Sequence, residues 1–176
     1  YGPICSPRSI NSKHKKYTQF HKDRLNRPKK LKDMLNAMFF YKISRWLYLH
    51  HIPFIPKLIT LLIFLIYNSK VPYKAKIGKG TKLGYGGIGV VIHSDATIGA
   101  NCLISQNVTI GRGKSKYPGI PIIGNNVVIH HGAIVFGGIT IGDNAEIGAN
   151  AVVNKPVPAN AIVAGVPAKI LRIKQS

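Results

Sequence analysis

The chain has 176 residues, of which 25 are Lys or Arg and only 5 are Asp or Glu, so its formal net charge is +20. Hydrophobic residues make up 45% of it, enough for a folded core, which excludes a wholly disordered or collagen-like chain despite 18 Gly and 11 Pro. Two cysteines, Cys5 and Cys102, are too few for a disulfide scaffold, and residues 1–7 lack the basic flank and apolar core of a signal peptide. We therefore expect a cytoplasmic protein.

The positive charge is concentrated in the first half of the chain. Residues 1–80 contain 17 Lys and Arg against 2 Asp, whereas residues 81–176 contain 8 basic and 3 acidic residues. The segment Arg8–Lys32 is basic, polar and nearly free of aliphatic side chains, which is typical of a solvated arm. The sequence predicts a flexible basic arm over residues 1–30.

A helical leader is predicted over residues 31–69. Apolar residues fall near helical spacing between Leu31 and Leu47, which indicates an amphipathic helix, and Pro53 and Pro56 then interrupt it. The apolar segment Leu58–Tyr67 follows; ten helical residues rise about 15 Å, half of the hydrocarbon thickness, so it cannot span a bilayer alone. Two alternatives remain open. The leader packs on the rest of the protein or a sister subunit, or it meets the inner face of an anionic membrane.

From Ile77 onward the sequence repeats with a period of six residues. An aliphatic residue leads each unit, and nine of the eleven steps between successive leads are six residues long. Gly follows the lead in seven of the twelve units, and small or β-branched residues recur four positions after it. The period predicts a hexapeptide solenoid. Its leads are Ile77, Leu83, Ile92, Ile98, Ile104, Ile110, Ile123, Ile129, Val135, Ile141, Ile147 and Val153.

Twelve units build about four coils of a triangular solenoid with three short strands in each coil. The leads point inward and stack on those of the next coil about 4.8 Å away, and Gly is expected at the corners. A stack this short leaves apolar side chains on its flat faces, so we expect a closed assembly, most simply a homotrimer. The predicted fold class is mainly β, with the basic arm and short helices preceding the coils.

The last third of the chain resembles the closing coils of hexapeptide acyltransferases. The resemblance rests on Ile141–Val153, on Pro156-Val-Pro158 and on the ending Ala164-Gly-Val-Pro-Ala-Lys169, and within this superfamily the serine acetyltransferase group is most similar. It implies a left-handed parallel β-helix over residues 70–176, a homotrimer, and acetyl-CoA as donor without a metal. The leader, in contrast, looks like that of acetyltransferases encoded with capsule or other surface-glycan genes.

The same resemblance implies a set of residues for the coenzyme. A small residue two positions after a lead lines the pantetheine groove in the family, and these positions are occupied by His131 and Ala149, which are 18 residues, or one coil, apart. Lys155 and Lys169 match positions that meet the nucleotide end of CoA. A Lys ammonium suits a flexible contact with phosphate as a point charge.

The acceptor residues of the serine enzymes are replaced in this chain. Their Asp-His pair after the lead equivalent to Leu83 corresponds to Gly84-Tyr85, and their Arg-His-Pro corresponds to Gly119-Ile120-Pro121. An amino acid would then lack partners for its charged ends, which costs several kcal/mol when they are buried. We therefore predict a sugar hydroxyl of a surface polysaccharide or its precursor as acceptor, with Tyr85 shaping its pocket.

Acetyl transfer to a hydroxyl needs a base, most often a His. The solenoid contains His93, His130 and His131, and His93 is the first choice because it follows the strand beside the Tyr85 stretch, where glycan-type sequences look similar. His131 is the second choice. Tyr85 would be a poor base because a phenol has a pKa near 10.

The sequence thus predicts an acetyl-CoA-dependent O-acetyltransferase acting on a glycan, and three alternative functions stand beside this prediction. One is serine O-acetylation in cysteine biosynthesis. Another is a β-helical zinc enzyme of the carbonic anhydrase type, which needs three converging imidazoles; His130 and His131 are adjacent and should point apart. The last is nucleic-acid binding through the basic leader, where no recognised motif accompanies the charge. No metal and no nucleic acid are expected.

Overall fold

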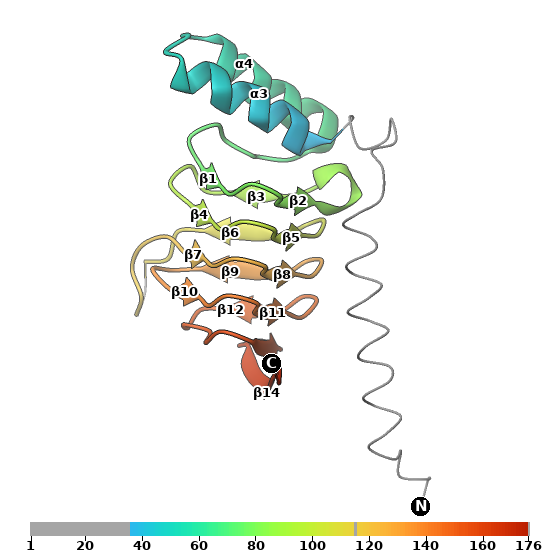
Figure 1. Cartoon of the computed structure of the whole chain (residues 1–176), viewed down its shortest axis with the longest axis vertical. Helices are drawn as coiled ribbons and strands as arrows, with labels where there is room; N and C mark the ends of the chain where they lie inside the picture. Colours follow the sequence, from blue (N-terminus) through green and yellow to red (C-terminus); the bar gives the residue numbers. More distant parts are fainter. Residues whose placement is uncertain (1–35, 115, 176) are drawn as a thin grey trace, which may run out of the picture. The chain divides into compact units, whose positions relative to one another are not determined.

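The computed structural model describes residues 36–114 and 116–175, all of which belong to one compact unit that spans residues 35–176. The predicted basic arm, residues 1–30, lies outside the described residues. Two helices, α3 (Ala37–Leu49) and α4 (Ile55–Tyr67), precede the coils and lie together across one end of them (Figure 1). Among the described residues, no helix is both long and apolar enough to cross a membrane.

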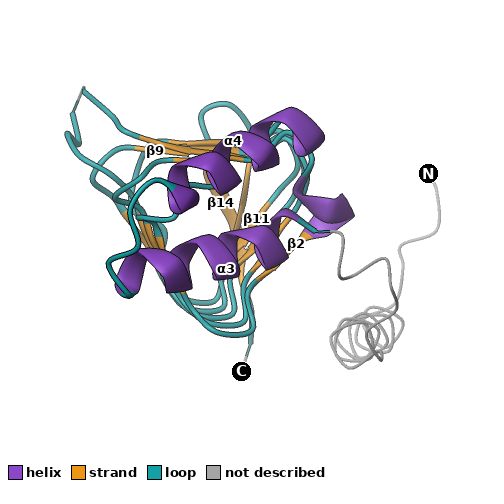
Figure 2. Ribbon diagram, turned by 90° about the horizontal axis from the view of Figure 1, so that it is seen from above, coloured by secondary structure: helices purple, strands orange, loops and turns teal. Residues whose placement is uncertain are grey.

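The coils form a three-sided solenoid, which Figure 2 shows end-on. One side contains β1 (Lys76–Ile77), β4 (Thr97–Ile98), β7 (Ile122–Ile123) and β10 (Thr140–Ile141). The second contains β2 (Lys82–Leu83), β5 (Leu103–Ile104), β8 (Val128–Ile129), β11 (Glu146–Ile147), β13 (Ala161–Ala164) and β14 (Lys169–Ile173). The third contains β3 (Val91–Ile92), β6 (Thr109–Gly111), β9 (Ile134–Phe136) and β12 (Val152–Val153). Neighbouring strands are parallel except for the antiparallel pair β13 and β14.

The hexapeptide period accounts for the register between coils. Each lead pairs with the lead one coil away, as Ile98 does with Ile123 and Ile123 with Ile141. All leads from Leu83 onward are at most 3% exposed, and the small residues four positions later, such as Ala133 and Ala151, are fully buried. The prediction of about four coils with inward-pointing leads is confirmed.

The residues at the corners differ from the expectation that Gly would form the turns between strands. The left-handed backbone falls mainly on Asn three positions after the lead, as at Asn101 (φ 56°) and Asn150 (φ 55°), because Asn tolerates this conformation better than other residues with a side chain. The Gly directly after the lead is required for another reason. A Cβ on Gly99 would lie 2.4 Å from the carbonyl oxygen of Gly124 in the next coil, so the Gly permits the close approach of two coils.

The helices close the N-terminal end of the solenoid. The Tyr41 hydroxyl donates to the carbonyl of Ala75 at 2.7 Å, and burial raises the pKa of this phenol. The two helices are joined by the Ser44 hydroxyl, which is buried and donates to the carbonyl of Pro56 at 3.0 Å. The predicted interruption of the first helix lies between Leu49, where α3 ends, and Ile55, where α4 begins. Pro56 occupies the first turn of α4, where the missing N–H costs nothing.

Neighbouring residues of β7 provide a test of the inward-pointing leads. We expect Ile123→Ala to lower the free energy of unfolding by about 2–5 kcal/mol, because Ile123 is 1% exposed and its truncation leaves a cavity between two coils. Ile122→Ala removes the same atoms from a side chain that is 54% exposed and should cost about 1 kcal/mol or less. Urea unfolding of both variants measures the difference; equal losses would contradict the assignment of the core.

Candidate active site

Two corners of the triangle carry the predicted site residues. The residues after β5, β8 and β11 form one corner, here called the His131 corner, and the residues after β3, β6 and β12 form the other, here called the His93 corner. The side that contains β3, β6, β9 and β12 separates them. On this side the chain runs from one corner to the other in about five extended residues, so the two corners are roughly 15 Å apart.

The structure brings His131 and Ala149 together. Strands β8 and β11 are in register with an offset of 18 residues, and the carbonyl of His131 accepts a hydrogen bond from the N–H of Asn150 at 2.9 Å. Both side chains lie at the exposed surface of the His131 corner, one coil apart. Lys169 belongs to the same neighbourhood, because it pairs with Ala164 in β13, which in turn continues the register of β11.

Tyr85 lies in a bulge at the same corner. The step of nine residues between Leu83 and Ile92 forms a 3₁₀ turn, Gly84–Gly87, in which Tyr85 has a left-handed backbone (φ 51°) and is 71% exposed. The base of the bulge is tightly packed, because a Cβ on Gly87 would lie 3.1 Å from the Cβ of Ala37 in α3. The turn therefore presents the phenol outward from a rigid support.

His93 occupies the other corner with two charged partners. Its Nδ1 accepts a hydrogen bond from the backbone N–H of Asp95 at 3.2 Å and lies 3.8 Å from Oδ2 of the same residue. Arg112, which follows β6, places a guanidinium nitrogen 3.8 Å from that carboxylate oxygen. The His93 side chain is 30% exposed, and those of Asp95 and Arg112 are 63% and 53% exposed. An imidazole, a carboxylate and a guanidinium thus meet at the surface.

Lys155 follows β12 at the His93 corner, three coils away from His93, and is exposed. The predicted site residues are therefore not one cluster within a single protomer. His131, Ala149 and Lys169 gather near one corner beside the Tyr85 bulge, whereas His93 and Lys155 lie at the other.

Three side chains of these corners were not identified from the sequence. Gln106 stands two positions after a lead at the His131 corner, and its Oε1 is buried without a hydrogen-bond partner among the described residues. The sequence could have indicated Gln106, because it stands two positions after a lead, as His131 and Ala149 do. Asp95 and Arg112 gave no such signal, because they are 17 residues apart and meet only through the pairing of β3 with β6.

An ion-pair network lies next to His131 on the outer face of the second side. The Nε2 of His130 is 3.0 Å from Oε1 of Glu146, and the ammonium of Lys174 is 3.1 Å from Oε2. The hydrogen bond from His130 and the charge of Lys174 lower the pKa of Glu146 to about 2, although burial opposes the shift. Lys174 also donates to the carbonyl of Asn144 at 3.0 Å, so the network attaches the chain end to β11.

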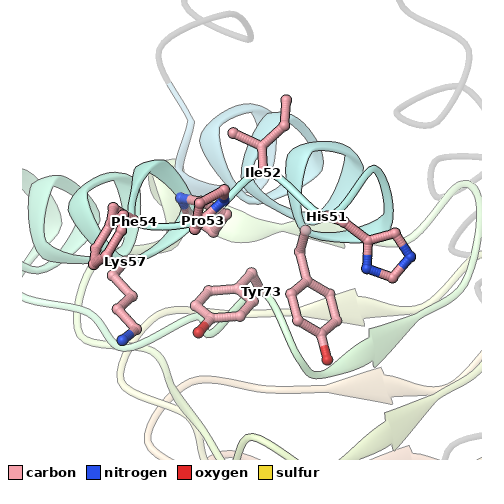
Figure 3. Close-up of a pocket in the computed structure, with 8 residues that line it drawn as sticks. His51, Ile52, Pro53, Phe54, Lys57 and Tyr73 are labelled. Carbon is pink, nitrogen blue, oxygen red and sulfur yellow. The ribbon is translucent and has the colours of Figure 1, made fainter.

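The predicted site residues of the described ranges form no metal-binding group, and they do not line the hollow that lies beside the helices. Within the described ranges, no group of three His, Cys, Asp or Glu residues is arranged to hold a metal ion. A hollow of about 300 Å³ lies at the turn between α3 and α4, and Figure 3 shows residues that line it, among them His51, Lys57 and Tyr73. None of the predicted site residues is in its lining.

Comparison with known proteins identifies the class first. The family described as "Bacterial transferase hexapeptide (six repeats)" matches residues 120–155. The serine acetyltransferase of Synechococcus elongatus is 38% identical over 136 residues, which cover 77% of this chain and 55% of that protein. The serine acetyltransferase of Helicobacter pylori strain J99 is 36% identical over 138 residues, covering 78% of this chain and 80% of that protein.

Solved structures agree with these relatives. The Brucella abortus serine acetyltransferase in complex with coenzyme A is 31% identical, has a TM-score of 0.73, and is matched over 79% of this chain and 56% of its own. The Neisseria gonorrhoeae enzyme in complex with serine is 32% identical, has a TM-score of 0.70, and is matched over 77% and 55%. The likeness confirms the left-handed parallel β-helix. This chain spans about half the length of these two proteins.

By fold and repeat, the chain thus falls in the class of hexapeptide-repeat acyltransferases. It belongs to the serine acetyltransferase family. The names of these relatives favour the serine alternative over the predicted glycan acceptor, and none of them supports a place in polysaccharide biosynthesis.

The network of Glu146 predicts a pH-dependent contribution to stability. A carboxylate whose pKa is lower in the folded than in the unfolded chain stabilises the fold above the ordinary pKa of 4.5, and this stabilisation is lost as the pH falls toward about 2. We expect Glu146→Gln to lower the free energy of unfolding by about 1–2 kcal/mol above pH 4.5, and the difference from wild type to vanish near pH 2. Denaturant unfolding across this range measures it; a constant difference would contradict the assignment.

Proposed function

We propose that the protein is an acetyl-CoA-dependent O-acetyltransferase and that its acceptor is the hydroxyl of free serine. The observation that carries the serine assignment is the meeting of His93, Asp95 and Arg112 at one corner. An amino acid has an ammonium and a carboxylate, and this corner offers a carboxylate and a guanidinium as partners for them, beside an imidazole. The names of the similar proteins support the same acceptor.

The roles of the three residues follow from their chemistry. A guanidinium matches a carboxylate in a bidentate geometry, so Arg112 would hold the carboxylate of serine while Asp95 attracts its ammonium. His93 would then take the proton of the serine hydroxyl. These partners replace the charged residues that the serine enzymes have at the positions of Gly84-Tyr85 and Gly119-Ile120.

The reaction is a direct transfer without an acyl-enzyme. The serine oxygen attacks the thioester carbonyl carbon while Nε2 of His93 accepts the hydroxyl proton, the C–S bond breaks, and the proton passes to the leaving thiolate. To act as base at Nε2, His93 must carry its other proton on Nδ1. In the structure Nδ1 accepts from the backbone N–H of Asp95, so this tautomer would require the imidazole to give up that hydrogen bond and turn Nδ1–H toward Oδ2 of Asp95, which lies 3.8 Å away. The carboxylate would then orient the ring and stabilise the imidazolium.

The donor would lie along the His131 corner. His131 and Ala149 line the groove for pantetheine, and Gln106 adds a buried amide oxygen that needs a donor. The amide N–H groups of pantetheine are donors of this kind. Lys169 would contact the phosphates of CoA from this corner, and Lys155 would contact them from the His93 corner of a neighbouring copy.

A homotrimer would bring the residues of the two corners together at one site. Within a protomer, one side of the triangle separates His131, Ala149 and Lys169 from His93 and Lys155. A base and a thioester therefore meet only if the His93 corner of one copy faces the His131 corner of the next. A threefold ring of heterologous contacts creates three such junctions. Exposed aliphatic side chains on the intervening side, including Val91 and Ile134, support a contact there.

A sugar hydroxyl is the second candidate acceptor. Tyr85 is 71% exposed beside the donor residues, and its phenol offers an apolar ring face for stacking on a sugar and a hydroxyl for hydrogen bonding to it. The loop that carries Ile120 is closed by an antiparallel pair of hydrogen bonds between Gly113 and Gly119, at the His93 corner. This acceptor would need neither Asp95 nor Arg112.

The base is tested by His93→Ala. Turnover should fall about 100-fold or more, because proton transfer loses its acceptor, whereas CoA binding should stay close to wild type. A melting curve separates this effect from unfolding. Near-normal turnover in His93→Ala together with collapse in His131→Ala would transfer the role to His131.

Mixed assemblies test the junction between copies. Ala149→Tyr should block the groove and abolish CoA binding. Coexpressed His93→Ala and Ala149→Tyr chains would then form rings in which about a quarter of the junctions contain both wild-type corners, so activity should return to about that level. Assemblies of each variant alone are the controls, and no recovery in the mixture would contradict a shared site.

The acceptor is tested by comparing L-serine with a panel of sugars and nucleotide sugars. Saturable acetylation of L-serine is expected, and Arg112→Gln should raise its KM about 10- to 100-fold, because a charged hydrogen bond is lost. Lys114→Gln, in the same loop, is the matched control for the change in net charge. If a sugar is the better substrate and Arg112→Gln leaves its turnover unchanged, the second candidate is correct.

A further inference from the structure

The outer surface of the two helices is apolar and uncovered in the described unit. The buried residues of α4 are Pro56, Ile63 and Tyr67, and the opposite side carries Leu58, Leu61 and Leu65 at helical spacing, with exposed fractions of 65%, 50% and 70%. Helix α3 likewise carries exposed apolar side chains, Phe39, Ile43 and Trp46, on the side opposite its buried residues. This hairpin face consists of Phe39, Ile43, Trp46, Leu49, Phe54, Leu58, Leu61, Leu62 and Leu65.

Positive charge surrounds this apolar face without any carboxylate. The sequence contains no Asp or Glu between Asp33 and Asp95, so both helices and the whole first coil lack carboxylate side chains, and their charged side chains are Lys and Arg. Lys42, Lys57 and Lys70 are exposed on or beside the helices. In the sequence, ten further Lys and Arg stand between Arg8 and Lys32, outside the described residues. A partner that covers the face must therefore supply negative charge.

The hollow at the turn between the helices combines both kinds of chemistry. Lys57 and the phenols of Tyr48 and Tyr73 line it together with Phe54, and Figure 3 shows the polar ends of Lys57 and Tyr73 on the same side of the turn. The ammonium of Lys57 lies 6.0 Å from the centre of the Phe54 ring. An ammonium and phenol hydroxyls are donors to phosphate, and Phe54, 77% exposed, is a large apolar side chain at the rim.

From these observations we propose that the hairpin face docks on an anionic lipid membrane, with a phosphate headgroup in the hollow. Each helix has 13 residues and rises about 20 Å, so the helices lie along the surface with their leucines among the acyl chains and their lysines at the headgroups. Trp46 and Tyr48, both exposed, suit the boundary between the two layers. A second copy of the hairpin is a poorer occupant, because pairing two faces without carboxylates would place basic residues against each other.

Co-sedimentation of the full chain with phosphatidylcholine vesicles, with and without phosphatidylglycerol, tests the docking. Binding is expected only with phosphatidylglycerol and should weaken as salt rises. Leu65→Gln should weaken it roughly tenfold through lost apolar contact, whereas Leu171→Gln, which alters a side chain 66% exposed at the far end of the solenoid, should not change it. Lys57→Gln should weaken it about fivefold and leave the fold intact.

Two further results would overturn the proposal. Equal binding to neutral vesicles, or none to either, removes the anionic membrane as occupant. A fall in assembly mass by light scattering in Leu65→Gln, with vesicle binding unchanged, would instead identify a second copy as the cover. Melting curves and CoA binding in solution show that each variant is folded, and neither readout depends on the identity of the acceptor.

Discussion

The stacking of one coil on the next, over a spacing set by six-residue units, is the constraint on which the rest of the structure depends. Because each lead aliphatic is buried against its counterpart in the neighbouring coil, the register between strands allows no slippage. The two-residue strands would be far too short to persist by themselves. They are stable only as members of a stack that shares one apolar interior, so loss of a single lead affects two coils.

This constraint also explains where chemistry is possible. The strands leave little freedom to side chains that point inward, and the predicted site residues His93, His131, Ala149 and Lys155 all follow strands at the corners. Residues 18 apart in sequence, such as His131 and Ala149, become neighbours at a corner because one coil has that length. The two long steps in the repeat supply what the regular coils lack, a bulge that presents Tyr85 and a loop that carries Arg112. The side chains proposed to meet the acceptor therefore include two that come from departures from the repeat.

The two ends of the solenoid are covered in different ways. At the C-terminal end, β14 turns back on β13 and the network of Glu146 with Lys174 attaches the last residues, so the edge is paired. At the N-terminal end, the helices cover the coils with one face and leave the other apolar. The same two helices that protect the solenoid edge thus present the hairpin face on their opposite side.

The sequence by itself determined the solenoid, because a strict period of six is compatible with one regular packing, and it determined the acyltransferase family through the closing motifs. It also placed His131 and Ala149 together, since a distance of one coil can be counted. Only the tertiary structure decided that His93 lies at a different corner, that Asp95 and Arg112 meet beside it, and that Asn instead of Gly turns most corners. These depend on the course of the irregular steps, whose lengths carry no period, and on backbone geometry that several residue types can satisfy.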